Sequence, residues 1–163
     1  MYEENENRRD AYEKLPVYQK AMEILELATK ISEFMDDEIN EKVSGSELKL
    51  AKFHAEEMLN NAYIIPPKIA GAAGVDLYDI KMENAAIIRK AARELYVGCN
   101  GFALFDLKGL EYLDVLREEI EAFRIEFAEW VKTFNPWDYI IDRWGLFNPP
   151  GVEYDDHDPD DDL

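Results

Sequence analysis

The chain has 163 residues, 47% of them hydrophobic, which suits one domain with a buried core. Its formal net charge of −18 argues against non-specific DNA binding, because phosphates attract clustered cations, but a local basic patch remains compatible with it. No stretch approaches the roughly 20 apolar residues of a membrane span, and the opening residues are too polar for a secretory signal. A soluble, cytoplasmic protein without membrane contact is expected.

The first predicted helix starts at Leu15-Pro16, since proline suits a first helical turn. Asp36-Asp37-Glu38 predicts its end. Ser44-Gly45-Ser46 then interrupts the helical pattern, and Ser46 is the expected N-cap of the next helix. The apolar residues of this helix recur in steps of three and four: Val17, Ala21, Ile24, Ala28, Ile31 and Met35.

The second predicted helix contains Pro66-Pro67 within its apolar stripe. Because the stripe continues beyond the two prolines, they should kink the helix without stopping it. Gly71 and Gly74 predict its end, and Asp76 is the expected cap of the next helix. The stripe consists of Leu48, Ala51, Ala55, Met58, Ala62, Ile65 and Ile69.

The third predicted helix begins near Leu77, and Gly98 and Gly101 weaken its last turns. Asn84 interrupts its apolar stripe, and either fixes the helix register through a buried hydrogen bond or lies at the edge of the stripe. Cys99, the only cysteine, is expected to be a small buried hydrophobe and not a reactive thiol. The stripe runs through Ile80, Asn84, Ile87, Ala91, Leu95, Cys99 and Phe102.

The fourth predicted helix has the most regular stripe and ends at Asn135-Pro136. Four such stripes with short connections predict an all-α fold, an antiparallel up-down-up-down four-helix bundle over residues 15–135. No segment has the period-two alternation of a half-buried strand. The fourth stripe consists of Leu113, Leu116, Ile120, Phe123, Phe127, Trp130 and Phe134.

The remaining segments are residues 1–14 at the N-terminus, an aromatic extension at 136–152 and an acidic tail at 153–163. Seven acids and no lysine or arginine stand in 153–162, so the tail is predicted to be disordered. The extension either packs over the end of its own bundle or reaches another protomer or a partner protein. Its candidate partner-binding residues are Trp137, Tyr139, Trp144, Leu146 and Phe147.

Catalytic, metal and cofactor sites are not predicted. A di-iron bundle needs two Glu-x-x-His motifs, but the chain has only His54 and His157, and neither has the motif. Phosphate-binding glycine loops and paired cysteines are absent from the sequence. We expect His54 at the boundary of the bundle, facing solvent or a neighbouring helix.

One polar surface stands out on the third helix. At 100° per residue, Arg89 and Arg93 point almost directly away from the predicted stripe, with Lys90 beside them. They form either a patch for phosphate or acidic groups, or a solvated face balanced by nearby glutamates such as Glu94. The candidate nucleic-acid-binding residues are Arg89, Lys90, Arg93, Lys68 and Lys81.

Two segments resemble a known family. Leu15-Pro16-Val17-Tyr18-Gln19-Lys20-Ala21 is similar to its opening Leu-x-Val-Tyr/Trp-x-x-Ala. Ile64-Ile65-Pro66-Pro67-Lys68-Ile69-Ala70 is similar to its Ser-Ile-Pro-x-Asn-Ile-Ala-Glu-Gly, with Lys68 in place of the asparagine and Gly71 in place of the glutamate. The chain thus resembles the four-helix proteins of ribosomal-RNA intervening sequences, which include the accessory variability determinants of diversity-generating retroelements.

This resemblance implies a ring, typically a homopentamer, that in the retroelement branch binds a reverse transcriptase and its template RNA. The leading hypothesis is therefore a non-catalytic accessory protein of that kind. The alternative is a protein-only interaction module that uses its acidic surface and aromatic extension. A third hypothesis is an acidic mimic that blocks a nucleic-acid-binding protein.

Overall fold

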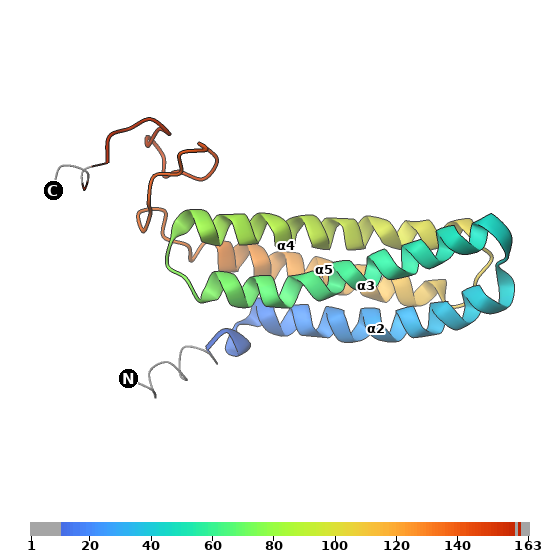
Figure 1. Ribbon diagram of the computed structural model, residues 1–163. Coiled ribbons are helices and arrows are strands. Elements are labelled where there is room, and N and C mark those ends of the chain that lie inside the picture. Colours follow the sequence, from blue (N-terminus) through green and yellow to red (C-terminus); the bar gives the residue numbers. More distant parts are fainter. Residues whose placement is uncertain (1–10, 159, 161–163) are drawn as a thin grey trace, which may run out of the picture.

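The structure, a computed structural model, describes residues 11–158 and 160. Expectations for residues 1–10 and for the end of the acidic tail lie outside the described residues. The described elements are η1 (Ala11–Lys14), α2 (Pro16–Lys42), α3 (Gly45–Ala73), α4 (Tyr78–Gly98), η2 (Cys99–Leu104) and α5 (Leu110–Val131) (Figure 1). No strand occurs within residues 11–158 and 160, so the all-α prediction is confirmed.

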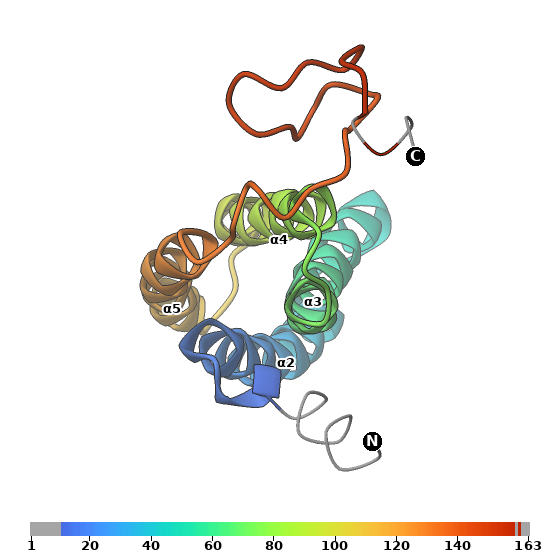
Figure 2. The same ribbon diagram turned by 90° about the vertical axis from the view of Figure 1, so that its left-hand side faces the viewer.

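The four long helices lie side by side and surround one core (Figures 1 and 2). Helix α3 packs against both α2 and α4, and α5 packs against α2. The seam between α4 and α5 is the least closely packed of the four. Across the described chain, no helix is long and apolar enough to cross a membrane.

Most of the predicted stripes form the core. All six predicted residues of α2 are buried, and Ile39 extends their pattern by one more step. In α3 only Leu48 is half-buried, and in the stripe predicted for the fourth helix only Phe127 is. Helix α3 continues through Pro66-Pro67, as predicted, because the stripe on both sides of the prolines is buried in the same core.

Four predicted helix boundaries are wrong. Helix α5 (Leu110–Val131) ends before Asn135-Pro136. Helix α2 runs past Asp36-Asp37-Glu38 to Lys42, and Ile39 is buried there. The Glu38 carboxylate accepts a 3.0 Å hydrogen bond from the backbone N–H of Lys108. This contact joins residues 70 positions apart, so the helix propensity of residues 36–38 could not indicate it. Ser46 lies inside α3, because Ser44 occupies the N-cap position and the helix starts at Gly45, with φ of +66°.

The cap of α4 also differs from the expected one. Leu77, and not Asp76, occupies the N-cap position and makes no side-chain cap hydrogen bond. The free backbone N–H of Tyr78 instead donates a 2.8 Å hydrogen bond to the carbonyl oxygen of Asp138, which lies in the C-terminal extension. A carbonyl 60 positions away in the chain therefore accepts the hydrogen bond of a backbone N–H that has no partner within the first turn of α4.

The first half of α4 is rotated relative to the predicted stripe. Ala85, Ile88 and Ala92 are buried, whereas Ile80, Asn84 and Ile87 are only half-buried. The Asn84 amide donates a 2.9 Å hydrogen bond to the Ile80 carbonyl of its own helix, so no bond to another helix fixes the register. Small alanines let α4 lie close to its neighbours, and this packing, more than side-chain hydrophobicity, decides which side of α4 faces inward.

Candidate interaction surfaces

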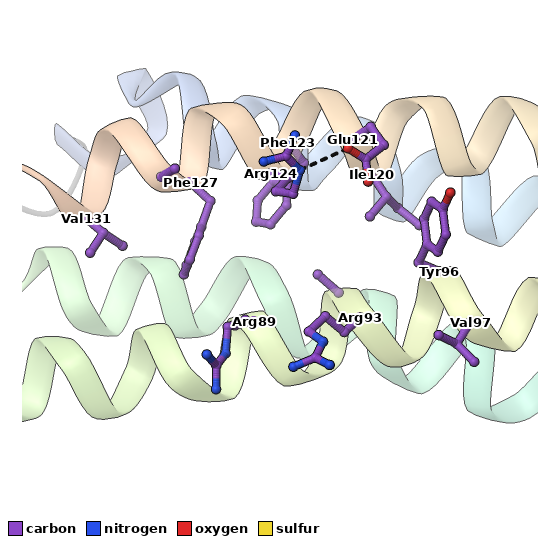
Figure 3. A pocket seen from close by; sticks show the side chains of 12 residues that line it. Arg89, Arg93, Tyr96, Val97, Ile120, Glu121, Phe123, Arg124, Phe127 and Val131 are labelled. Atoms are coloured by element: carbon purple, nitrogen blue, oxygen red, sulfur yellow. Dashed lines mark hydrogen bonds and ion pairs between the residues drawn. The ribbon is translucent and has the colours of Figure 1, made fainter. Parts of the chain in front are cut away.

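A groove runs along the loosely packed seam between α4 and α5. It has a volume of about 560 Å³ and a mostly apolar lining (Figure 3). Phe123 and Ile120 form its buried floor, while Val97 of α4 is 64% exposed at its edge. The apolar lining consists of Ala92, Tyr96, Val97, Ile120, Phe123, Phe127, Ala128 and Val131.

Three arginines stand along this groove. Arg89 and Arg93 come from α4 and Arg124 from α5, on the opposite side (Figure 3). Arg124 forms a 2.9 Å ion pair with Glu121, but Arg89 and Arg93 form no ion pair with any residue that the structure describes. Two free guanidinium groups therefore border an apolar surface on a strongly acidic protein.

The orientation predicted for this patch needs a correction. Because α4 is rotated, Arg89 and Arg93 are not opposite its buried face but on the flank that turns toward α5. Lys90 lies further round, where its ammonium pairs with Glu94. All three residues line one hollow on the outer surface of α4, and Arg89 and Arg93 also border the α4–α5 groove.

The two lysines added to the patch have different surroundings. Lys68 is half-buried and lines a hollow of about 760 Å³ between α3 and α4, together with Lys90. The Lys81 ammonium donates a 2.8 Å hydrogen bond to the Ala72 carbonyl oxygen and lies 5.0 Å from the centroid of the Phe134 ring. Burial lowers the pKa of Lys81. The Lys81 ammonium is therefore engaged at the end of the bundle, and Lys81 does not line the α4–α5 groove.

The C-terminal extension is anchored at the end of the bundle where α4 begins (Figures 1 and 2). Phe134 and Ile141 are buried, and Phe134 packs edge-on against Trp130 with ring centroids 4.8 Å apart. With the bond from Tyr78 to Asp138, these contacts hold the start of the extension against the helices. This part matches the expectation that the extension packs over its own bundle.

Beyond Ile141 the extension forms a turn organised by Asp142. Its carboxylate accepts hydrogen bonds of 3.0, 2.9 and 2.8 Å from the backbone N–H groups of Trp144, Leu146 and Phe147. These bonds, that from Phe147 most of all, lower the pKa of Asp142. Asn148 closes the turn by exchanging hydrogen bonds with the backbone of Asp142.

This turn presents apolar side chains to solvent. Trp144 is 96% exposed and Leu146 is 72% exposed. Among the other candidates, Trp137 is exposed, while Tyr139 and Phe147 are half-buried. The Arg143 guanidinium donates hydrogen bonds to the carbonyls of Tyr154 and Asp156, so the start of the acidic tail lies beside the turn. Trp144 is therefore an exposed apolar side chain on an ordered turn, beside the start of the acidic tail.

Groups able to do chemistry are dispersed. In the described part of the chain, no three His, Cys, Asp or Glu side chains gather as a metal site would require. His54 is half-buried, with its ring 6.2 Å from that of Phe102. Cys99 is buried as predicted, its thiol donates to the Leu95 carbonyl, and burial raises its pKa to about 11.

The chain was compared with protein-family models, curated proteins and solved structures. None of them matches it. Sequence reasoning found the arginines and the aromatic residues of these surfaces but missed the groove. Val97 and Ala128 could have indicated the groove, because both are apolar and lie outside the predicted core stripes.

Proposed function

We propose that this chain is a non-catalytic accessory protein of a diversity-generating retroelement, a cytoplasmic homo-oligomer that binds a reverse transcriptase and its template RNA. In this proposal the chain is an up-down-up-down bundle of the intervening-sequence four-helix type, assembled into a ring that is most simply a pentamer. The resemblance of the segments at 15–21 and 64–70 motivates the family, and the all-α fold is compatible with it.

The observation that carries the RNA half of the proposal is the guanidinium groups of Arg89 and Arg93, which pair with no acid among the residues that the structure describes. In a chain with a formal charge of −18, uncompensated arginines next to each other on one helix face are conspicuous. Arginine binds phosphate through several parallel hydrogen bonds. Lys90 and Lys68 extend the positive surface from α4 toward α3.

The proposal is tested by RNA retention at increasing salt. An Arg89→Glu/Arg93→Glu variant should lose at least tenfold in affinity, and the wild type should weaken steeply as salt rises. Lys30→Glu/Lys132→Glu is the matched control, since it makes the same charge change at exposed lysines that already pair with glutamates. Equal loss in both variants, or no retention by the wild type with or without its polymerase, would refute the RNA half.

A second candidate function is a protein-only interaction module. The exposed Trp144 and Leu146 favour it, because large apolar side chains on an ordered turn are typical anchors of protein interfaces. Deleting residues 136–163 should then abolish binding of the partner and leave RNA retention intact. Loss of RNA retention alone, with the partner still bound, would argue against this second function.

A further inference from the structure

We propose that the turn at residues 142–148 of one copy inserts Trp144 into the α4–α5 groove of a second copy. This inference deepens the oligomer part of the proposed function and rests on it. The proposed interface is heterologous, because it joins two different surfaces of the same chain. Such contacts build a closed ring when the rotation between copies closes.

The groove has the right shape and chemistry for an aromatic anchor. Its volume of about 560 Å³ exceeds what one indole ring needs, and a floor of Phe123 and Ile120 offers aromatic and aliphatic contacts. The seam between α4 and α5 is the least closely packed of the four, and the core residues Phe123 and Ile120 line the groove there.

The turn is built to deliver that anchor. Three backbone N–H groups bound to the Asp142 carboxylate hold residues 142–147 in one conformation, so little conformational entropy remains to be lost on binding. Yet Trp144, on this ordered turn, is 96% exposed, and Leu146 beside it is also exposed. An ordered turn that leaves a tryptophan in water is typical of an interface anchor.

The charges next to the two surfaces are complementary. The groove is lined by Arg89, Arg93 and Arg124 and by one acid, Glu121, which pairs with Arg124, so the charge of the lining is positive. On the turn, Arg143 donates hydrogen bonds to the carbonyls of Tyr154 and Asp156, so the segment that carries the exposed acids Glu153 and Asp155 lies beside the turn. An apolar anchor flanked by acids therefore faces an apolar groove flanked by arginines, and this pairing identifies the occupant as a second copy of the chain.

A second copy fits these observations better than the chain's own turn does. The extension is fixed at the end of the bundle by the buried Phe134 and by the bond from Tyr78 to Asp138. From there its turn projects away from the helices (Figures 1 and 2). One consequence is competition, since docking of the acidic turn and binding of RNA use the same Arg89 and Arg93.

The test is the molar mass in solution, measured by light scattering on the full chain at low and high salt. Two single variants each disable one surface. Trp144→Ser removes the anchor, and Ala128→Glu places a charge in the groove at a position that is exposed. Leu104→Ser and Ala103→Glu are controls, since both change exposed residues outside the groove and the turn. Thermal unfolding followed by circular dichroism checks that every variant is folded.

We expect an oligomer for the wild type and both controls, and a monomer for each single variant. An equimolar mixture of the two variants should give a mass of two chains, because one intact turn and one intact groove remain, enough for a single contact. High salt and Arg89→Glu/Arg93→Glu should both reduce the mass of the wild type.

Three results would overturn the inference. They are a monomeric wild type, an unchanged mass in Trp144→Ser, and a mixture that stays monomeric. If Trp144→Ser kept its mass but lost a protein partner, the anchor would belong to that partner instead. RNA retention is measured separately on Trp144→Ser, in which no docked turn covers Arg89 and Arg93. Failure of retention with the predicted masses would refute the RNA function and leave the assembly standing.

Discussion

The imidazole ring of His54 in α3 lies against the α-carbon of Gly101 in η2. A β-carbon on Gly101 would come within 2.8 Å of two ring atoms of His54. The ring also approaches Phe102, at 6.2 Å between centroids. His54 thus contacts the segment after α4, and the glycine that weakens the end of that helix also makes room for a side chain from α3.

Gly101→Ala should therefore destabilise the protein by about 1–2 kcal/mol, because the His54 ring must move out of its packed position. Gly98→Ala is the control, since its β-carbon would meet nothing within 4 Å and its backbone is helical. That change should stabilise by about 0.5–1 kcal/mol. Chemical denaturation measures both, and equal effects of the two substitutions would contradict the contact.

Replacing Lys81 by methionine should cost about 1 kcal/mol. Methionine keeps most of the side-chain volume but loses the hydrogen bond to the Ala72 carbonyl, one of the last carbonyls of α3, and the contact with Phe134. Lys90→Met removes only an exposed ion pair with Glu94 and should cost less than about 0.5 kcal/mol. If thermal unfolding shifted equally in both variants, Lys81 would have no special role at the bundle end.

The thiol of Cys99 should be almost inert in the native protein. With a pKa of about 11, the thiol carries roughly one thiolate per thousand molecules at pH 8, and burial blocks access as well. Labelling by a thiol reagent should be slow at pH 8 and become complete in denaturant. Ala103→Cys adds an exposed thiol as a positive control. Rapid stoichiometric labelling of the native wild type would disprove the burial of Cys99.

The turn that carries Trp144 should depend on the charge of Asp142. Asp142→Asn weakens the three hydrogen bonds to the backbone and should broaden or shift the amide resonances of Trp144, Leu146 and Phe147. Asp138→Asn makes the same substitution in the extension but leaves its backbone carbonyl bonded to Tyr78. Those resonances should stay in place in that control.

The same turn predicts a pH dependence. The pKa of Asp142 is lower in the folded chain than its unfolded value of about 3.9, so the carboxylate stabilises the turn above that pH. This stabilisation is lost as the pH falls through the folded pKa, where the carboxyl becomes protonated. In an NMR titration Asp142 should therefore titrate below the usual aspartate value. A normal or raised pKa would show that the turn does not depend on the charge.

Much of the fold follows from the sequence by itself. Side chains three and four residues apart share a helix face by local geometry alone, so the stripes of α2, α3 and α5 were predictable and are buried. The burial of Cys99 and the passage of α3 through Pro66-Pro67 followed from the same pattern.

The tertiary structure decided what local geometry leaves open. The sequence of α4 allows two different faces to turn inward, because alanines occur on both. Packing against the neighbouring helices buries Ala85, Ile88 and Ala92. That rotation places Arg89 and Arg93 beside the α4–α5 groove. Contacts between distant residues, such as Tyr78 with Asp138 and Glu38 with Lys108, set the helix ends and the position of the extension. Such contacts depend on the distances between packed helices, which no short stretch of sequence encodes.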